Sequence, residues 1–122
     1  VRIYTPGVPD KPTIYQLTRS YFPHLLRAGV KIYSYTPGFL HAKTWLVDDR
    51  IAAVGTVNLD YRSLYLHFEN SVLIYGGAVL DDVRRDLAEI EKESAAVTLA
   101  DCRTGFFGTL YSAVLRLVAP LC

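Results

Sequence analysis

Apolar and polar residues alternate with two different periods along this chain, and the two periods mark different elements. Short stretches in which apolar residues alternate or cluster, bounded by Gly, Pro or Asp, predict β-strands. There are five of them: Val1–Thr5, Val30–Tyr35, His41–Val47, Ile51–Gly55 and Glu69–Tyr75. The third and fourth are separated only by the turn Asp48-Asp49-Arg50, so they are expected to form a hairpin.

Three longer segments have the spacing of helices. In the segment from Val79 to Glu93, apolar residues recur every three or four positions, which places them on one face of a helix. Thr13 to Ala28 and Phe106 to Val118 are predicted to be helical as well, and Pro23 is expected to kink or restart the first of these. Residues 58–67 are predicted to form a loop with one helical turn.

Together these elements predict an α/β domain in which a mixed β-sheet is flanked by helices. The 122 residues are the size of one domain, so residues 1–122 are taken as a single unit. Two features suggest a fragment of a longer protein: the chain has no Met, and it opens directly on a strand.

Composition narrows the class of protein. The net charge is +1, whereas a protein that neutralises many nucleic-acid phosphates usually has a clear basic excess, so binding to nucleic acid is disfavoured. Cys102 and Cys122 fit neither a disulfide framework nor a zinc pattern and are interpreted as reduced thiols. No apolar run reaches the roughly 18 residues of a membrane-spanning helix.

Candidate chemistry is concentrated between His41 and Glu69. His41 and Lys43 are two residues apart in a predicted strand, so their side chains are expected to share a face, while Asp48 should point the other way. Gly55, Thr56 and Asn58 follow after the hairpin. Of the other histidines, His24 and His67 lack partners at a useful spacing and are interpreted as having no functional role.

These residue types suit phosphodiester chemistry. An imidazole such as His41 can attack phosphorus and carry the group covalently, and Lys43 beside it can offset the charge of the phosphate oxygens. Gly55 allows a close approach of the backbone, and Asn58 can donate its amide. Glu69 can accept a hydrogen bond from the far ring nitrogen of His41 and so orient the attacking nitrogen.

The pattern His-x-Lys-x4-Asp followed by x6-Gly-Thr-x-Asn resembles the signature of the phospholipase D superfamily, with Thr56 where that family more often has Ser. Flanking stretches resemble the second half of bacterial cardiolipin synthases, in particular Pro37–Lys43, Asn58–Ser63 and Phe68-Glu69. Two positions depart from that pattern, because His67 stands where Asn is expected and Asn70 where an apolar residue is expected.

The resemblance implies a role for each matching residue. His41 would belong to a pair of histidines that act as nucleophile and general acid, and Lys43 and Asn58 would bind phosphate. Glu69 would orient His41, which gives His41, Lys43 and Glu69 as the catalytic set. The motif residues that it implies to be structural are Asp48, Gly55 and Thr56. The family needs no metal and no cofactor, and its site is built from two such motifs, of which this chain carries one.

The implied reaction is phosphatidyl transfer between two phosphatidylglycerol molecules through a phosphohistidine, which gives cardiolipin and glycerol. The implied partners are the phospholipid substrate, a membrane surface and a second motif-bearing half, in the same polypeptide or in a second copy. The implied location is the bacterial cytoplasmic membrane, on its cytosolic side. Two alternatives stay open: a dimeric phosphodiesterase or nuclease of the same superfamily, and a non-catalytic half domain.

Overall fold

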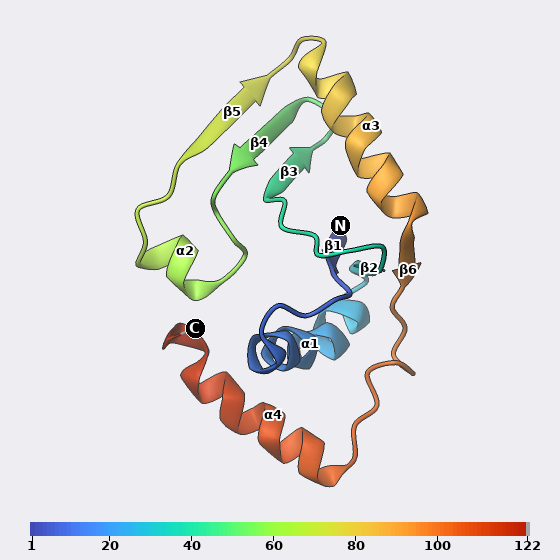
Figure 1. Ribbon diagram of the computed structural model, residues 1–122, viewed down its shortest axis with the longest axis vertical. Coiled ribbons are helices and arrows are strands. Elements are labelled where there is room, and N and C mark those ends of the chain that lie inside the picture. The colour runs from blue at the N-terminus through green and yellow to red at the C-terminus, as the bar shows by residue number, and fades with distance from the viewer. Residues whose placement is uncertain (122) are drawn as a thin grey trace.

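The computed structural model describes residues 1–121, apart from the side chains of residues 106, 118 and 121. Helices and strands are interspersed along the chain, with three successive strands between the first two helices (Figure 1). In order, they are β1 (Arg2–Pro6), α1 (Pro12–Arg27), β2 (Lys31–Tyr35), β3 (Thr44–Val47), β4 (Ile51–Gly55), α2 (Tyr61–Tyr65), β5 (Ser71–Tyr75), α3 (Val79–Lys92), β6 (Ser94–Ala96), α4 (Phe106–Val118) and the 3₁₀ turn η1 (Ala119–Leu121).

The α/β class with helices around mixed strands is confirmed, but the strands are divided between two three-stranded sheets. In the first, β2 lies between β1, which runs parallel to it, and β6, which runs antiparallel. The second is an antiparallel meander of β3, β4 and β5. Residues 36–43 join the two sheets without entering either, because Pro37 and Gly38 interrupt the extended ladder.

Two predicted strands are shorter than expected. The strand predicted from His41 begins at Thr44, and the strand predicted from Glu69 begins at Ser71, so His41 and Glu69 both precede their strands. The sequence analysis also missed β6, a short strand of small residues that pairs with β2. Conversely, α1 passes through Pro23 as one helix, so the expected restart does not occur.

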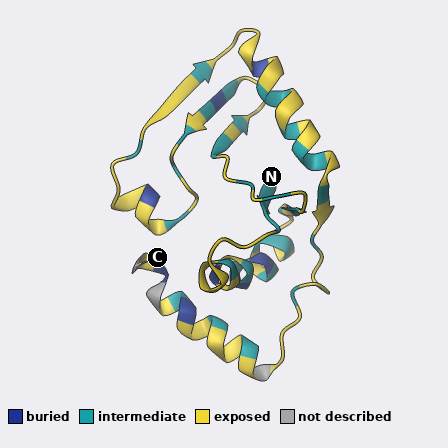
Figure 2. Ribbon diagram, viewed as in Figure 1, coloured by how far each residue is buried: buried dark blue, intermediate teal, exposed yellow. Residues whose placement is uncertain are grey.

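The largest buried cluster lies between α1 and α4. It consists of Leu17, Leu115 and Ala119, with Tyr21 packed against it. The guanidinium of Arg116 lies 5.0 Å from the centre of the Tyr21 ring, a cation–π contact that joins the two helices. Away from this cluster, buried positions are few and scattered over the ribbon (Figure 2).

The second sheet is anchored mainly from α3, whose Leu80 is almost fully buried, as is Ala52 on β4. Within the described part of the chain, none of the helices is both long and apolar enough to span a bilayer. Cys102 is a free cysteine, and Cys122 lies outside the described residues.

Candidate active site

Five residues of the motif line one hollow of about 300 Å³. They come from the segment before β3 and from the end of β4 with the loop that follows, and they are His41, Lys43, Gly55, Thr56 and Asn58. The β3–β4 pairing brings the two segments together, and it is extended by a hydrogen bond from the Gly55 amide to the Lys43 carbonyl at 3.2 Å. The hairpin therefore builds the hollow.

His41 and Lys43 share the hollow although neither is in a strand. The ammonium of Lys43 donates to the backbone carbonyl of His41 at 3.0 Å. The imidazole of His41 is exposed and stacks on the ring of Phe39, with centroids 5.4 Å apart. Among the described residues, no hydrogen bond to that imidazole is found. A basic nitrogen and a cation thus stand side by side in an open hollow.

Glycine is needed at position 55 for a structural reason other than the close approach of a phosphate that the sequence suggested. A Cβ at this position would lie 2.5 Å from the Cα of Ser71 and would also meet the Asn70 carbonyl and the Ser71 hydroxyl. Only glycine therefore lets β5 pass this close to the end of β4.

Asn58 lies in the loop between β4 and α2 and is exposed to the hollow. The carboxylate of Asp60 then accepts from the Ser63 amide at 2.7 Å, which caps the short helix α2 at its N-terminus. This cap fixes where the chain turns after Asn58.

Glu69 lies in a different network from the one expected. Its Oε2 accepts from the hydroxyl of Thr56 at 2.5 Å, and its Oε1 is 3.7 Å from Nδ1 of His67. The pKa of Glu69 is held below its ordinary value, chiefly because the hydroxyls of Thr56 and Ser63 donate to the carboxylate, with a smaller effect of His67. Nε2 of His67 in turn accepts from Nε of Arg62 at 3.2 Å.

Within the described residues, neither a hydrogen bond nor an ion pair joins Glu69 to His41. The expected contact is therefore not formed in this chain, and the orienting role of Glu69 stays a prediction. The expectation that His67 lacks partners is wrong, because it contacts both Arg62 and Glu69. The two-residue spacing of His67 and Glu69 was the signal in the sequence that could have revealed this pair.

Asp48 lies at the opposite end of the hairpin from the hollow. Both Asp48 and Asp49 have positive φ, 50° and 53°, and the Arg50 amide donates to the Val47 carbonyl at 3.0 Å. This is the geometry of a two-residue type I′ turn, which aspartate tolerates better than most residues.

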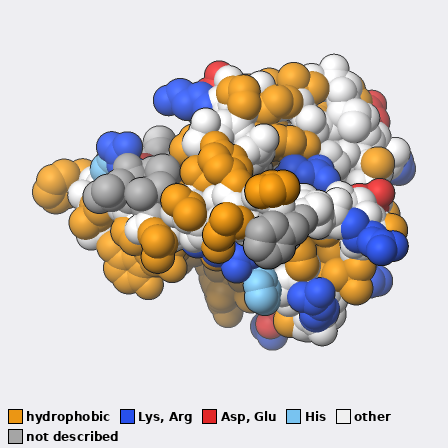
Figure 3. All heavy atoms as spheres, turned by 90° about the horizontal axis from the view of Figure 1, so that it is seen from below, with side chains coloured by type: hydrophobic (Ala, Val, Ile, Leu, Met, Phe, Trp, Pro, Cys, Tyr) orange, Lys and Arg blue, Asp and Glu red, His pale blue; other side chains and the backbone are white. Residues whose placement is uncertain are grey.

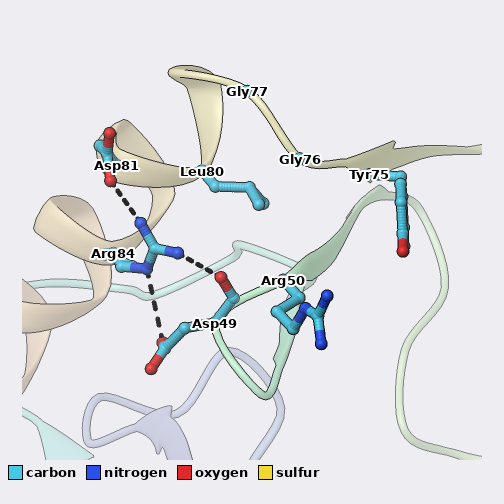
Figure 4. Close-up of a pocket in the computed structure, with 8 residues that line it drawn as sticks. All are labelled: Asp49, Arg50, Tyr75, Gly76, Gly77, Leu80, Asp81 and Arg84. Carbon is cyan, nitrogen blue, oxygen red and sulfur yellow. Dashed lines mark hydrogen bonds and ion pairs between the residues drawn. The ribbon is translucent and has the colours of Figure 1, made fainter.

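A second hollow, of about 310 Å³, lies beside this turn (Figure 4). Its central cation, Arg84, donates to the Asp81 carboxylate and to the Asp49 carbonyl, and lies 3.5 Å from the Asp49 carboxylate. These contacts join α3 to the hairpin, and they show that the guanidinium of Arg84 is paired within the protein.

The donor set of the first hollow favours an anionic ligand. Its lining includes an imidazole, an ammonium and a carboxamide, and no carboxylate from the described residues. In the described part of the chain, no three His, Cys, Asp or Glu side chains gather closely enough to hold a metal ion. The hollow can therefore offer a nucleophilic nitrogen together with two hydrogen-bond donors to a phosphoryl group.

Comparison with known families places this geometry in context. A family model described as "Cardiolipin synthase, PLD-like domain" matches residues 1–90. The chain is 49% identical over 122 residues to an uncharacterized protein of Streptococcus mutans and 40% identical over 122 residues to a cardiolipin synthase of Clostridium perfringens. Each alignment covers 99% of this chain but 26% of the relative, so the chain spans about a quarter of their length.

A solved structure has a similar fold. The chain matches the phosphatidylserine synthase of Haemophilus influenzae with a TM-score of 0.68 and 19% sequence identity, over 99% of this chain and 33% of that one. At this identity the likeness establishes the arrangement of helices and strands.

Proposed function

Because the chain belongs to the cardiolipin synthase family of PLD-like domains, we propose that it supplies one half of an active site that transfers a phosphatidyl group between phosphatidylglycerol molecules. One observation carries the proposal: His41, Lys43 and Asn58 line the same hollow. A nucleophilic nitrogen and two donors for phosphate oxygens are the groups that a metal-independent phosphodiester exchange requires.

The reaction has two displacements. In the first, an imidazole nitrogen forms a bond to phosphorus while the bond from phosphorus to the head-group glycerol oxygen breaks. The second histidine of the pair gives its proton to that oxygen, and glycerol leaves. In the second, the hydroxyl of another phosphatidylglycerol attacks phosphorus, its proton passes to the same second histidine, and the phosphorus–nitrogen bond breaks. His41 is one member of this pair, and the other belongs to the second half.

Lys43 and Asn58 offset the charge that grows on the non-bridging oxygens. Because Lys43 donates to the His41 carbonyl, a phosphate bound in the hollow would compete with that carbonyl as acceptor. Removal of one such donor lowers turnover by about 10²–10³-fold in enzymes that stabilise an oxyanion in this way.

Exposed apolar side chains beside the hollow support a second half that covers it. Many apolar side chains of α2, of the segments on either side of it and of β5 are exposed, and hydrophobic side chains also occupy much of the face seen in Figure 3. The exposed residues of these segments are Leu59, Tyr61, Leu64, Tyr65, Leu66, Phe68, Val72, Leu73 and Tyr75. Apolar surface of this extent is typical of an interface. In the completed enzyme, Glu69 is proposed to orient a site histidine.

The substrate determines where the enzyme works. Phosphatidylglycerol lies in a bilayer, so the proposed site acts at a membrane surface, in bacteria at the cytoplasmic membrane. The near-neutral charge of the chain gives no general support for a nucleic-acid substrate.

Reconstitution tests the proposal. The chain is measured alone and combined with a second motif-bearing half, with labelled phosphatidylglycerol in vesicles, while sedimentation reports the oligomeric state. The expected result is transfer by the assembled pair and almost none by the monomer, because one histidine cannot serve as both nucleophile and acid. A fully active monomer contradicts the two-half site. Cleavage of DNA by the pair, without lipid transfer, would point to a phosphodiesterase instead.

A further inference from the structure

The loop that carries Asn58 is closed by hydrogen bonds of the backbone and of one side chain, that of Thr56. The Thr56 amide donates to the Asn70 carbonyl at 3.0 Å, and the Asn70 amide donates to the Thr56 hydroxyl oxygen at 3.0 Å. Thr56 and Asn70 therefore join the two ends of a segment that contains Asn58 and α2. This junction directly continues the β4–β5 pairing, in which Gly55 lies opposite Ser71.

Both the proton and the oxygen of the Thr56 hydroxyl form hydrogen bonds in this junction. The hydroxyl has a single proton. That proton lies toward Glu69 Oε2 at 2.5 Å, with the Asn70 carbonyl as a longer alternative at 3.3 Å. The oxygen already accepts from the Asn70 amide. Although Thr56 lines the hollow, its hydroxyl is thus committed to the protein and not to a ligand.

The other oxygen of Glu69 lies near a ring nitrogen of His67. Nε2 of His67 accepts from Arg62, and Nδ1 lies 3.7 Å from Glu69 Oε1, which is too far for a hydrogen bond. The Glu69 side chain is only 15% exposed, which limits competition from water. The carboxylate is therefore held by the Thr56 hydroxyl, with His67 as a more distant neighbour.

We propose that Glu69 is a positioning residue that acts on the hollow through the Thr56 hydroxyl. The bond between Glu69 and Thr56 fixes the end of β4, and with it the position of Asn58 two residues later. That the ligand is a phosphate rests on the function proposed above, whereas the link between Glu69 and Thr56 does not. This role is additional to the orientation of a histidine proposed above, since each carboxylate oxygen can accept a second hydrogen bond. The two roles are told apart because only this one predicts that Glu69 and Thr56 variants share one effect.

Amide hydrogen exchange in the 122-residue chain tests the link directly, because the Asn70 amide bonds to the Thr56 hydroxyl. Thr56→Val removes the acceptor and should speed exchange at Asn70 roughly 10-fold, the worth of one well-placed hydrogen bond. Thr56→Ser keeps the hydroxyl and should retain most of the protection. Glu69→Gln should speed exchange by less, and the double variant Thr56→Val/Glu69→Gln should exchange no faster than Thr56→Val alone.

His24→Asn is the matched control. His24 contacts Arg116 between α1 and α4, away from the hollow, so its replacement should leave exchange at Asn70 unchanged. His67→Ala should reproduce at most a small part of the Glu69→Gln effect, since His67 is only a distant neighbour of the carboxylate. Unchanged exchange at Asn70 in Thr56→Val would overturn the proposal, and so would a Glu69→Gln effect that persists undiminished when Thr56 is already valine.

Titration with inorganic phosphate, followed by NMR of the Asn58 side-chain amide, gives the functional readout. Thr56→Val and Glu69→Gln should weaken phosphate binding several-fold and non-additively. Additive losses would overturn the proposed link between them. If the unmodified chain binds no phosphate, the proposed function loses its phosphate site in this half, while exchange at Asn70 still decides whether Glu69 acts through Thr56.

Discussion

The ring of Phe39 stacks on the imidazole of His41, with centroids 5.4 Å apart and ring planes inclined by 25°. Among the described residues, the imidazole has no hydrogen-bond partner, so this stacking is the contact that limits its rotation. Phe39 is 48% exposed, which makes a major role in the folded core implausible. We therefore interpret Phe39 as a residue that orients His41 in the hollow.

Phe39→Ala should lower turnover of the reconstituted enzyme roughly 3- to 10-fold, because aromatic pairs contribute about 0.5–1.5 kcal/mol beyond their buried area. Phe39→Tyr keeps the ring and serves as the control. Turnover and thermal unfolding are measured for both. Equal rates in the two variants would show that the stacking has no part in catalysis.

Gly55→Ala should destabilise the fold by about 1–3 kcal/mol, since a methyl group there forces β5 away from β4. Gly38→Ala is the control, because a Cβ at Gly38 meets nothing within 4 Å. Denaturant unfolding of the two variants gives the comparison. A Gly55→Ala chain as stable as the Gly38→Ala chain would mean that the close approach of the two strands is not required.

Glu69→Gln should lower turnover while the fold stays intact, because a neutral amide is a weaker acceptor for the Thr56 hydroxyl than a carboxylate is, and it would balance less of the charge of the histidine that Glu69 is proposed to orient. General acid–base contributions of about 10²–10⁴-fold set the upper limit of the loss. The rate is measured in the reconstituted enzyme, with circular dichroism as the check on folding. An unchanged rate would make Glu69 a residue without a role in the reaction.

The same substitution has a pH signature. The pKa of Glu69 is lowered in the folded chain from an ordinary value of 4.5. The ionised carboxylate therefore stabilises the folded chain fully above pH 4.5, and this stabilisation is lost as the pH falls through the lower pKa of the folded state. The difference in Tm between wild type and Glu69→Gln should therefore be largest near neutral pH and shrink in acid. A difference that is independent of pH would argue against an ionised Glu69 in this network.

Local periodicity allowed most of the elements to be predicted. The hairpin of β3 and β4 follows from two short apolar runs around a pair of aspartates. The apolar spacing predicted the first residue of α3 correctly and its last residue one position too late. The grouping of His41 with Lys43 was also correct, but for a different reason. Both precede β3, and the hydrogen bond from the Gly55 amide to the Lys43 carbonyl, which continues the β3–β4 pairing, brings their segment to the hollow.

The partners of Glu69 and the strand β6 could not be predicted in this way. Glu69 contacts Thr56, thirteen residues away in sequence, because the β4–β5 register sets Gly55 opposite Ser71, and register depends on long-range packing. The small residues of β6 have no strand pattern of their own, and this strand forms because β2 offers it a free edge.

The central claim is that His41 takes part in covalent phosphatidyl transfer, and acid-sensitive labelling tests it most directly. The reconstituted enzyme is quenched during turnover of phosphatidylglycerol that carries a labelled phosphate, in excess chelator, and the label on histidine is quantified for wild type and His41→Ala. The account expects a phosphohistidine in the wild type, continued turnover in chelator, and loss of transfer in His41→Ala even though Lys43 and Asn58 remain. Full transfer by His41→Ala, or turnover without any histidine adduct, would contradict it.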